Sequence, residues 1–258
     1  MIAARWGLIV AAGVAIAAPA GAQETVSQAA KRVGTGTVRF QFKAHAGVCG
    51  NGQNMSFNTV HRDRRKNGEW ESECESGPVR VAMDVAGGAP TAIRFYVGGR
   101  WGGRGDAVDA GTMGASDAAS YFAKLAEEAA PKVAKEAIVV ATLADSANVW
   151  PMLLRVAKDD RRERDVRKSA VFWLGQAAGE SAAALNGLAE DGDEDIEVRK
   201  QAVFALSQRP KEEAVPALLK IVRGKGDARV RRTAIFWLGQ SADPRAVAYF
   251  EDVLTKPR

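Results

Sequence analysis

Cysteine and histidine, which serve in redox, metal and acid–base chemistry, are rare in this sequence, and all of them lie in its first third. Two cysteines, Cys49 and Cys74, and two histidines, His45 and His61, are the only ones among 258 residues. Two histidines cannot build a His-rich metal site, and the Cys/His spacing of zinc sites is absent. In an exported chain an even number of cysteines favours a disulfide. We therefore expect a Cys49–Cys74 disulfide, no metal and no cofactor.

Sequence patterns of hydrolytic enzymes are also missing. The chain has neither a G-x-S-x-G nucleophile elbow nor a Cys–His signature. The acidic run "DGDEDIE" at 191–197 begins like a calcium-binding loop, but Ile196 stands where such a loop needs glycine. Acidic residues ahead of a helix are explained by the helix dipole. A dispersed constellation of Ser, His and Asp would escape this search, but we expect a protein that is not an enzyme.

A basic cluster at 61–74, "HRDRRKNGEWESEC", allows two interpretations. Its side chains Arg62, Arg64 and Arg65 could bind an anionic polymer. Alternatively, Asn67-Gly68 predicts a two-residue hairpin turn, which would place these cations opposite acidic residues and largely neutralise them. The cross-strand pairs would be Lys66–Glu69, Arg64–Glu71 and Arg62–Glu73. We favour the structural pairing and keep polymer binding as the alternative.

The first 22 residues have the composition of a secretory signal peptide. One early cation, Arg5, precedes an apolar run from Leu8 to Ala18, and small residues follow Pro19. The run is shorter than the roughly 20 residues that a spanning helix needs. We expect cleavage after Ala22 and a periplasmic or secreted protein without a membrane span. In an exported protein the Arg-Gly segment at 98–105 does not predict a nucleic-acid partner. The formal net charge of +5 is too small to indicate any particular class of partner.

The second half of the chain repeats itself every 32 residues. Phe172, Phe204 and Phe236 stand at this interval, as do the arginines 167, 199 and 231. Within each unit the apolar residues recur with the period of an α-helix, and a second apolar helix follows. Asp243 is suited to cap the last of these helices, with Pro244 at its first position. One helix pair cannot cover its own apolar face, so the pairs must stack into a solenoid.

These units resemble short HEAT repeats of the phycobilisome-lyase-like type. That pattern runs V-R-x-x-A-x-x-A-L-G, a turn, then D-P-x-A-V-x-x-L. The positions that match it are Arg167, Arg199, Arg231, Gly175, Gly239, Asp243 and Pro244. The resemblance implies an α-solenoid, and most such arrays bind proteins, whereas some relatives act on bilin chromophores. The chain departs from the pattern where aromatic residues replace small or charged ones.

These aromatic residues form a predicted row along the array. On a helical wheel the Phe position points roughly 100° or more away from the apolar face. The rings could fill gaps between neighbouring helices, or they could form an apolar stripe that a partner covers. The candidate binding residues are Val171, Phe172, Trp173, Val203, Phe204, Ile235, Phe236 and Trp237.

The segment before the repeats alternates with a period of two, as half-buried strands do. This alternation runs through 37–44, 78–85 and 91–97. We therefore predict an α+β, two-domain fold: a small disulfide-linked β-sheet domain and an all-α HEAT-repeat solenoid. The predicted limits are 34–110 for the β-rich domain, 116–130 for a linking helix and 132–255 for four helix pairs.

Three functions are compatible with this organisation. The leading hypothesis is an exported scaffold that binds a protein partner through the surface of the repeats. The first alternative is a lyase-like or isomerase-like protein that handles a tetrapyrrole or another apolar ligand, as the family resemblance implies. The second is a binder of an anionic envelope polymer through the β domain.

Overall fold

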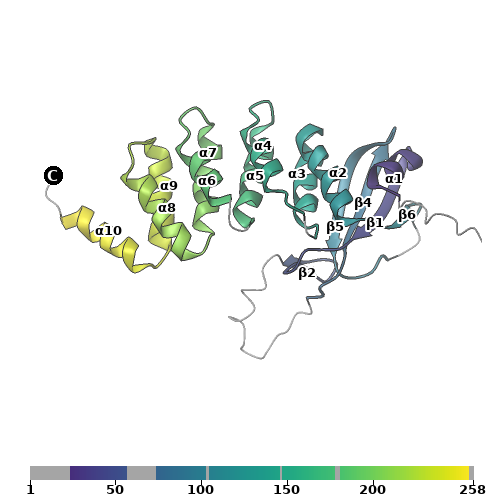
Figure 1. Cartoon of the computed structure of the whole chain (residues 1–258), viewed down its shortest axis with the longest axis horizontal. Helices are drawn as coiled ribbons and strands as arrows, with labels where there is room; N and C mark the ends of the chain where they lie inside the picture. Colours follow the sequence, from purple (N-terminus) through teal and green to yellow (C-terminus); the bar gives the residue numbers. More distant parts are fainter. Residues whose placement is uncertain (1–23, 57–73, 103–104, 146, 178–180, 256–258) are drawn as a thin grey trace, which may run out of the picture.

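The computed structural model describes residues 24–56, 74–102, 105–145, 147–177 and 181–255. The molecule is elongated, with a β-sheet at one end and helices stacked side by side toward the other (Figure 1). The α+β architecture is therefore confirmed. Three predictions concern residues outside the described ranges: the signal peptide at 1–22, the hairpin turn at Asn67-Gly68, and the polymer-binding cluster Arg62, Arg64 and Arg65.

The main sheet has four strands in the order β5-β4-β1-β6. They are β1 (Gly36–Phe42), β4 (Val79–Ala86), β5 (Ala89–Val97) and β6 (Val108–Thr112). The first three are antiparallel neighbours, whereas β6 lies parallel to β1. Gly87 and Gly88 both have positive φ, 59° and 76°, and make the tight turn between β4 and β5. Strand β6 reaches beyond the limit of residue 110 that the sequence suggested.

Helices cover one face of this sheet and leave the other open. The alternating apolar residues of β1 and β4, such as Phe40 and Val81, are completely buried beneath α1 (Val26–Val33) and α2 (Ala115–Glu128). Phe40 stacks on Phe122 of α2 with ring centroids 6.1 Å apart. Helix α1, which the sequence analysis did not predict, carries a capping box formed by Thr25 and Gln28.

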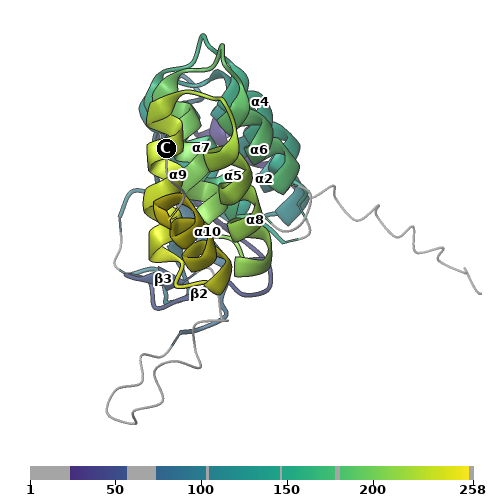
Figure 2. The same ribbon diagram turned by 90° about the vertical axis from the view of Figure 1, so that its left-hand side faces the viewer.

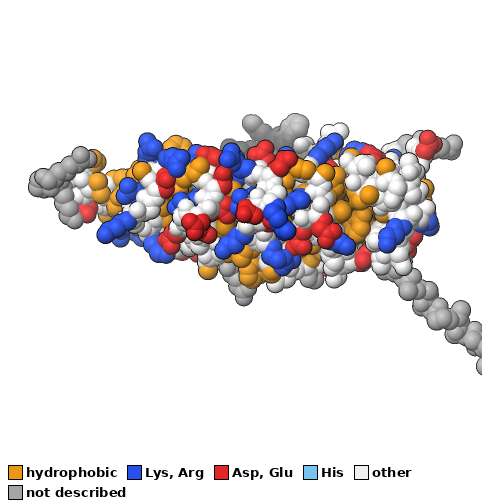
Figure 3. All heavy atoms as spheres, turned by 90° about the horizontal axis from the view of Figure 1, so that it is seen from above, with side chains coloured by type: hydrophobic (Ala, Val, Ile, Leu, Met, Phe, Trp, Pro, Cys, Tyr) orange, Lys and Arg blue, Asp and Glu red, His pale blue; other side chains and the backbone are white. Residues whose placement is uncertain are grey.

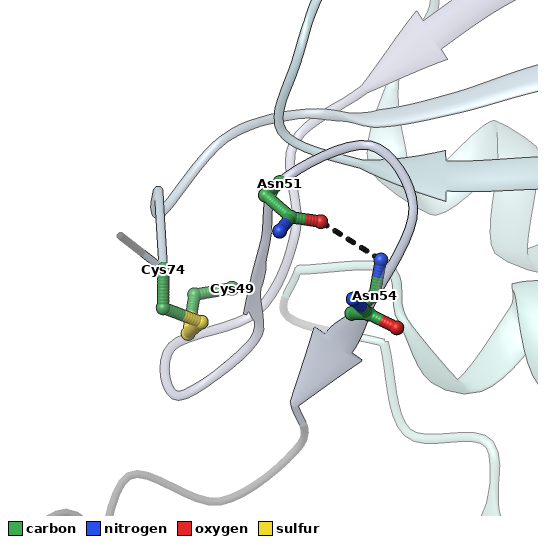
Figure 4. The surroundings of a disulfide bond; sticks show 4 residues. All are labelled: Cys49, Asn51, Asn54 and Cys74. Carbon is green, nitrogen blue, oxygen red and sulfur yellow. Dashed lines mark hydrogen bonds between the residues drawn. A yellow bond between two sulfur atoms is a disulfide. The ribbon is translucent and has the colours of Figure 1, made fainter. Parts of the chain in front are cut away.

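The predicted disulfide is present. Cys49 and Cys74 are bonded, with Cα atoms 5.2 Å apart, beside the short strands β2 (Cys49–Gly50) and β3 (Met55–Ser56). The side chain of Asn51 accepts a hydrogen bond from the backbone N–H of Asn54 and shapes the turn between these strands (Figure 4). The bond therefore ties the β2–β3 segment to the chain that leads into β4.

Eight helices follow in the described residues from 131 to 255. They are α3 (Pro131–Thr142), α4 (Trp150–Lys158), α5 (Arg164–Gln176), α6 (Ser181–Glu190), α7 (Ile196–Ser207), α8 (Lys211–Arg223), α9 (Ala228–Gln240) and α10 (Pro244–Thr255). The odd-numbered helices contact one another in one layer, and α4, α6 and α8 lie in a second layer. Asp243 accepts from the N–H of Arg245 at the start of α10, as predicted.

Helix α2 is more than the linking helix expected at 116–130. It contacts both α3 and α4, so it also acts as the first helix of the second layer. Its opposite face packs on the sheet through Phe122. One helix thus belongs to the core of both regions.

The arginine that recurs every 32 residues joins the two helical layers. Nε of Arg167 donates to the carbonyl of Ala157 at 2.9 Å, and Nε of Arg199 to that of Ala189 at 3.2 Å. Both side chains are buried. Each therefore supplies a cation and a donor to the last turn of the preceding second-layer helix, where carbonyls lack partners.

The sheet and the solenoid are continuous rather than flexibly linked. The N–H of His45 donates to the carbonyl of Leu143 at 2.9 Å, and the N–H of Asp145 donates to that of Lys43 at 3.0 Å. A single apolar core extends from Val26 to Ala246. In the described part of the chain, no helix is long and apolar enough to cross a membrane.

Candidate binding surfaces

Aromatic side chains of the repeats pack between neighbouring helices of the layer that contains α3, α5, α7 and α9, which we call the first layer. Phe172 of α5 stacks on Phe204 of α7, with centroids 6.3 Å apart and ring planes 12° apart. Phe204 in turn lies 5.1 Å from Trp237 of α9. Trp173 lies edge-on to Phe172 at 5.4 Å. These rings fill the space between helices, which is the packing interpretation of the pattern.

The row changes character at its last member. Val171 and Val203, which precede the two stacked rings, are completely buried. The equivalent residues of α9 are open: Ile235 is 40% exposed and Phe236 is 56% exposed. The aromatic side chains therefore contact one another from α5 to α9, but they are accessible to solvent mainly at α9.

Exposed apolar side chains are concentrated at this end of the solenoid. Among the described residues, seven large hydrophobic side chains are exposed, and five of these belong to α9 and α10. Leu254, at 83%, is the most exposed of them, and Val247 and Val253 accompany it on α10. Helix α10 buries only Ala246. Figure 2 views the molecule from this end, with α10 in front of the stack. Most of the large apolar side chains that are exposed in the described residues therefore lie at this end of the solenoid.

One face of the solenoid carries charged side chains of both signs. Seen from above, lysine and arginine side chains alternate with acidic ones along the length of the molecule (Figure 3). Several ion pairs connect neighbouring repeats, such as Arg164–Asp195 at 2.8 Å and Lys220–Glu190 at 2.9 Å. Such a surface has no dominant charge with which to attract a polyanion.

A hollow of about 470 Å³ lies where the sheet meets the solenoid. His45, Ser76 and Asp145 line it together. However, Asp145 is paired with Lys43 at 2.7 Å, and Nδ1 of His45 lies 2.7 Å from the carbonyl of Ala46. A nucleophilic triad needs the carboxylate to orient that ring nitrogen. The Lys43–Asp145 pair therefore joins the two regions, and the contact of His45 is local.

The ionisable groups with shifted pKa values belong to helix caps, ion pairs and the core. Arg94 is the main cause of the lowered pKa of Asp84, which is about 2. Arg245 likewise lowers the pKa of Asp243 to about 2. Burial raises the pKa of Tyr121 to about 12. These groups lie on separate elements and do not converge on one hollow, as acid–base pairs in an active site do.

A comparison with family models agrees with the repeat architecture of the second half. Residues 182–258 match the family model of HEAT repeats. A similar solved structure is that of human deoxyhypusine hydroxylase in complex with glycerol, with 20% sequence identity and a TM-score of 0.35. The match covers 55% of this chain and 57% of that one, so the chain spans less than two thirds of that protein. No curated protein sequence matches the chain.

Proposed function

We propose that this chain, whose second half is built of HEAT repeats, is a non-catalytic scaffold that binds a protein partner through the exposed end formed by α9 and α10. HEAT repeats in general form protein-interaction surfaces. We further propose that the protein is exported, because residues 1–22 read as a signal peptide and the Cys49–Cys74 disulfide suits an oxidising compartment.

The supporting observation is the exposure of Ile235 and Phe236. In the two preceding repeats the same positions are covered by the next first-layer helix, which contributes Phe204 against Phe172 and Trp237 against Phe204. The surface of α9 therefore has the shape and composition that a helix with an aromatic side chain covers elsewhere in the same molecule. We infer that the partner offers an amphipathic helix with an aromatic or large aliphatic anchor.

The test compares variants at the exposed end with one elsewhere. Ile235→Ser and Phe236→Ser should each abolish capture of a partner from the periplasmic fraction, with only a small loss of thermal stability, because both side chains are already partly exposed. Val108→Ser, which removes an exposed apolar side chain from β6, is the matched control and should keep the partner.

A photo-reactive p-benzoylphenylalanine at position 236 would identify the partner directly. It should cross-link to a helix of a different protein, whereas the same residue at Tyr96 should not. If both serine variants remain folded and retain every partner, the end of the solenoid is not the binding surface. A cross-linked product with twice the mass of this chain would instead show that the surface joins two copies.

A further inference from the structure

We infer that the open face of the β-sheet contains a pocket for a small ligand that carries a carboxylate or phosphate group beside a flat ring. The pocket has a volume of about 290 Å³ and lies at the other end of the molecule from α9 and α10. This inference is independent of the proposed protein partner.

The strand register creates the hollow. Arg39 of β1 and Arg94 of β5 are both paired with Ala82 of β4, so a small residue stands between two long cations on the outer face. In the next row Arg80 stands between Gln41 and Tyr96. The methyl group of Ala82 forms the floor, and guanidinium groups form the walls. Gly98 and Gly102 border the hollow and add no side chain to it.

The pocket has an excess of positive charge. Among the described residues, no carboxylate lies within 4.0 Å of a guanidinium nitrogen of Arg39 or Arg80, whereas Arg94 is paired with Asp84. Arg80 donates to two neutral acceptors, the carbonyl of Gly99 at 3.0 Å and the side-chain oxygen of Gln41. Arg100 adds a further exposed cation to the lining.

The acidic groups nearby are engaged with backbone amides. Asp109, which is paired with Arg39 in the register, accepts from the N–H of Gly111 at 2.8 Å. Glu75 accepts from the N–H of Gly99 at 3.3 Å. In the described part of the chain, Nε of Arg39 is buried without a hydrogen-bond partner. A buried donor of this kind is costly unless a ligand or solvent satisfies it.

An aromatic wall holds this arginine in place. The guanidinium of Arg39 lies 5.0 Å from the ring centroid of Trp101, within cation–π distance. Tyr96 packs edge-on against the same indole at 6.0 Å. A planar guanidinium fixed on a ring can bind an oxyanion with its nitrogens, while a flat ligand ring lies along the aromatic wall.

The volume indicates the size of the ligand. A hollow of about 290 Å³ is at the lower end of the range for small-molecule sites, which favours one ring with one charged group over a larger cofactor. Carboxylates and phosphates share the geometry that arginine recognises, so the experiment must distinguish them.

Isothermal titration calorimetry of the full chain with phenyl phosphate, benzoate and neutral benzamide tests the proposal. At least one of the two anions should bind saturably with a stoichiometry of one, and benzamide should not bind. The anion that binds more tightly identifies the charged group. Arg39→Gln should weaken binding about 10-fold or more, because it removes a charge-assisted contact.

Two further variants make the result specific. Asp84→Asn should tighten binding several-fold, because it frees Arg94 to face the ligand. Arg232→Gln, which removes an exposed cation from α9, should leave the affinity unchanged. Arg80→Lys, which keeps the charge but loses the planar fork, should weaken binding and replaces Arg39→Gln if that variant does not fold.

Three results would overturn the inference. The first is that neither anion binds saturably at low ionic strength. The second is that Arg39→Gln and Arg232→Gln weaken binding equally, which would indicate general charge attraction. The third is that heparin binds strongly while both small anions do not, which would assign the face to a polyanion.

Discussion

Two segments with almost the same sequence have different environments in this molecule. Residues 170–176 read AVFWLGQ and residues 234–240 read AIFWLGQ. Both lie in first-layer helices, α5 and α9. Val171 is completely buried and Phe172 is stacked, whereas Ile235 is 40% exposed and Phe236 is 56% exposed. The sequence of a repeat therefore determines which side of the helix is apolar, and the neighbouring repeat determines whether that side is covered.

The glycines of the two segments show the same contrast. A methyl group added at Gly175 would lie 2.7 Å from Cβ of Ala205 in α7, closer than carbon atoms can approach. A methyl group at Gly239 would have no neighbour within 4 Å. Neither glycine has a positive φ, and each helix continues one residue beyond it. The repeated glycine therefore allows close helix packing at Gly175 and has no packing role at Gly239.

A buried charge should give the largest difference between the two segments. We expect Val171→Asp to lower the free energy of unfolding by about 4 kcal/mol or more, because the carboxylate would lie in the continuous core. Ile235→Asp should lower it by only about 1 to 2 kcal/mol, since solvent reaches the carboxylate there but some apolar contact is lost. Urea unfolding monitored by circular dichroism measures both. Equal losses would show that the end of the solenoid is covered in solution.

Removal of an aromatic ring should have an intermediate effect. Phe204 contacts rings on both sides, so we expect Phe204→Ala to cost about 2 to 3 kcal/mol. Phe236→Ala should cost less than about 1 kcal/mol, because that ring contacts Trp237 on one side and is otherwise open. Thermal unfolding of the two variants provides the comparison. A larger loss at Phe236 would contradict the order of burial.

Replacing each of the two glycines by alanine should change the free energy of unfolding in opposite directions. Gly175→Ala should destabilise the protein by about 1 to 2 kcal/mol, because the forced separation of α5 and α7 exceeds the gain in helix propensity. Gly239→Ala should stabilise it by up to about 0.5 kcal/mol, since only the propensity term applies there. Denaturant midpoints decide between these signs. Stabilisation by both substitutions would mean that α5 and α7 are farther apart than the structure places them.

Local patterns predicted the elements of this fold better than their surroundings. The 32-residue spacing predicted the repeated helices, and alternation predicted β1, β4 and β5, because side-chain period is a local property. The parallel pairing of β6 with β1 depends on chain segments some 70 residues apart and left no local signal. Exposure of Phe236 depends on the absence of a covering helix in the described residues, which its own repeat does not encode. Similarly, the alternation placed Arg39 on the outer face of the sheet, but only the register brings it together with Arg80 and Arg94.

Substitution of the N-cap residues of α7 and α9, Asp195 and Asp227, should give the smallest difference in stability. That difference should depend on pH. Burial raises the pKa of Asp195, but hydrogen bonds from Arg164 and from the N–H groups of Glu197 and Val198 outweigh it, so the pKa falls below its usual 3.8. The stabilisation is therefore present above about pH 4 and is lost as the pH falls through the lowered value. Asp195→Ala should cost about 1 kcal/mol at pH 7 and less once the carboxyl group is protonated, because the neutral group still accepts from the cap N–H groups but loses its ion pair with Arg164. The pKa of Asp227 is lowered mainly by Arg229 of its own helix. Among the described residues, Arg199 of the preceding repeat adds a charge interaction but no hydrogen bond, so Asp227→Ala should cost less. Unfolding curves of both variants at pH 7 and pH 3 would contradict this account if the order were reversed or if the two losses were independent of pH.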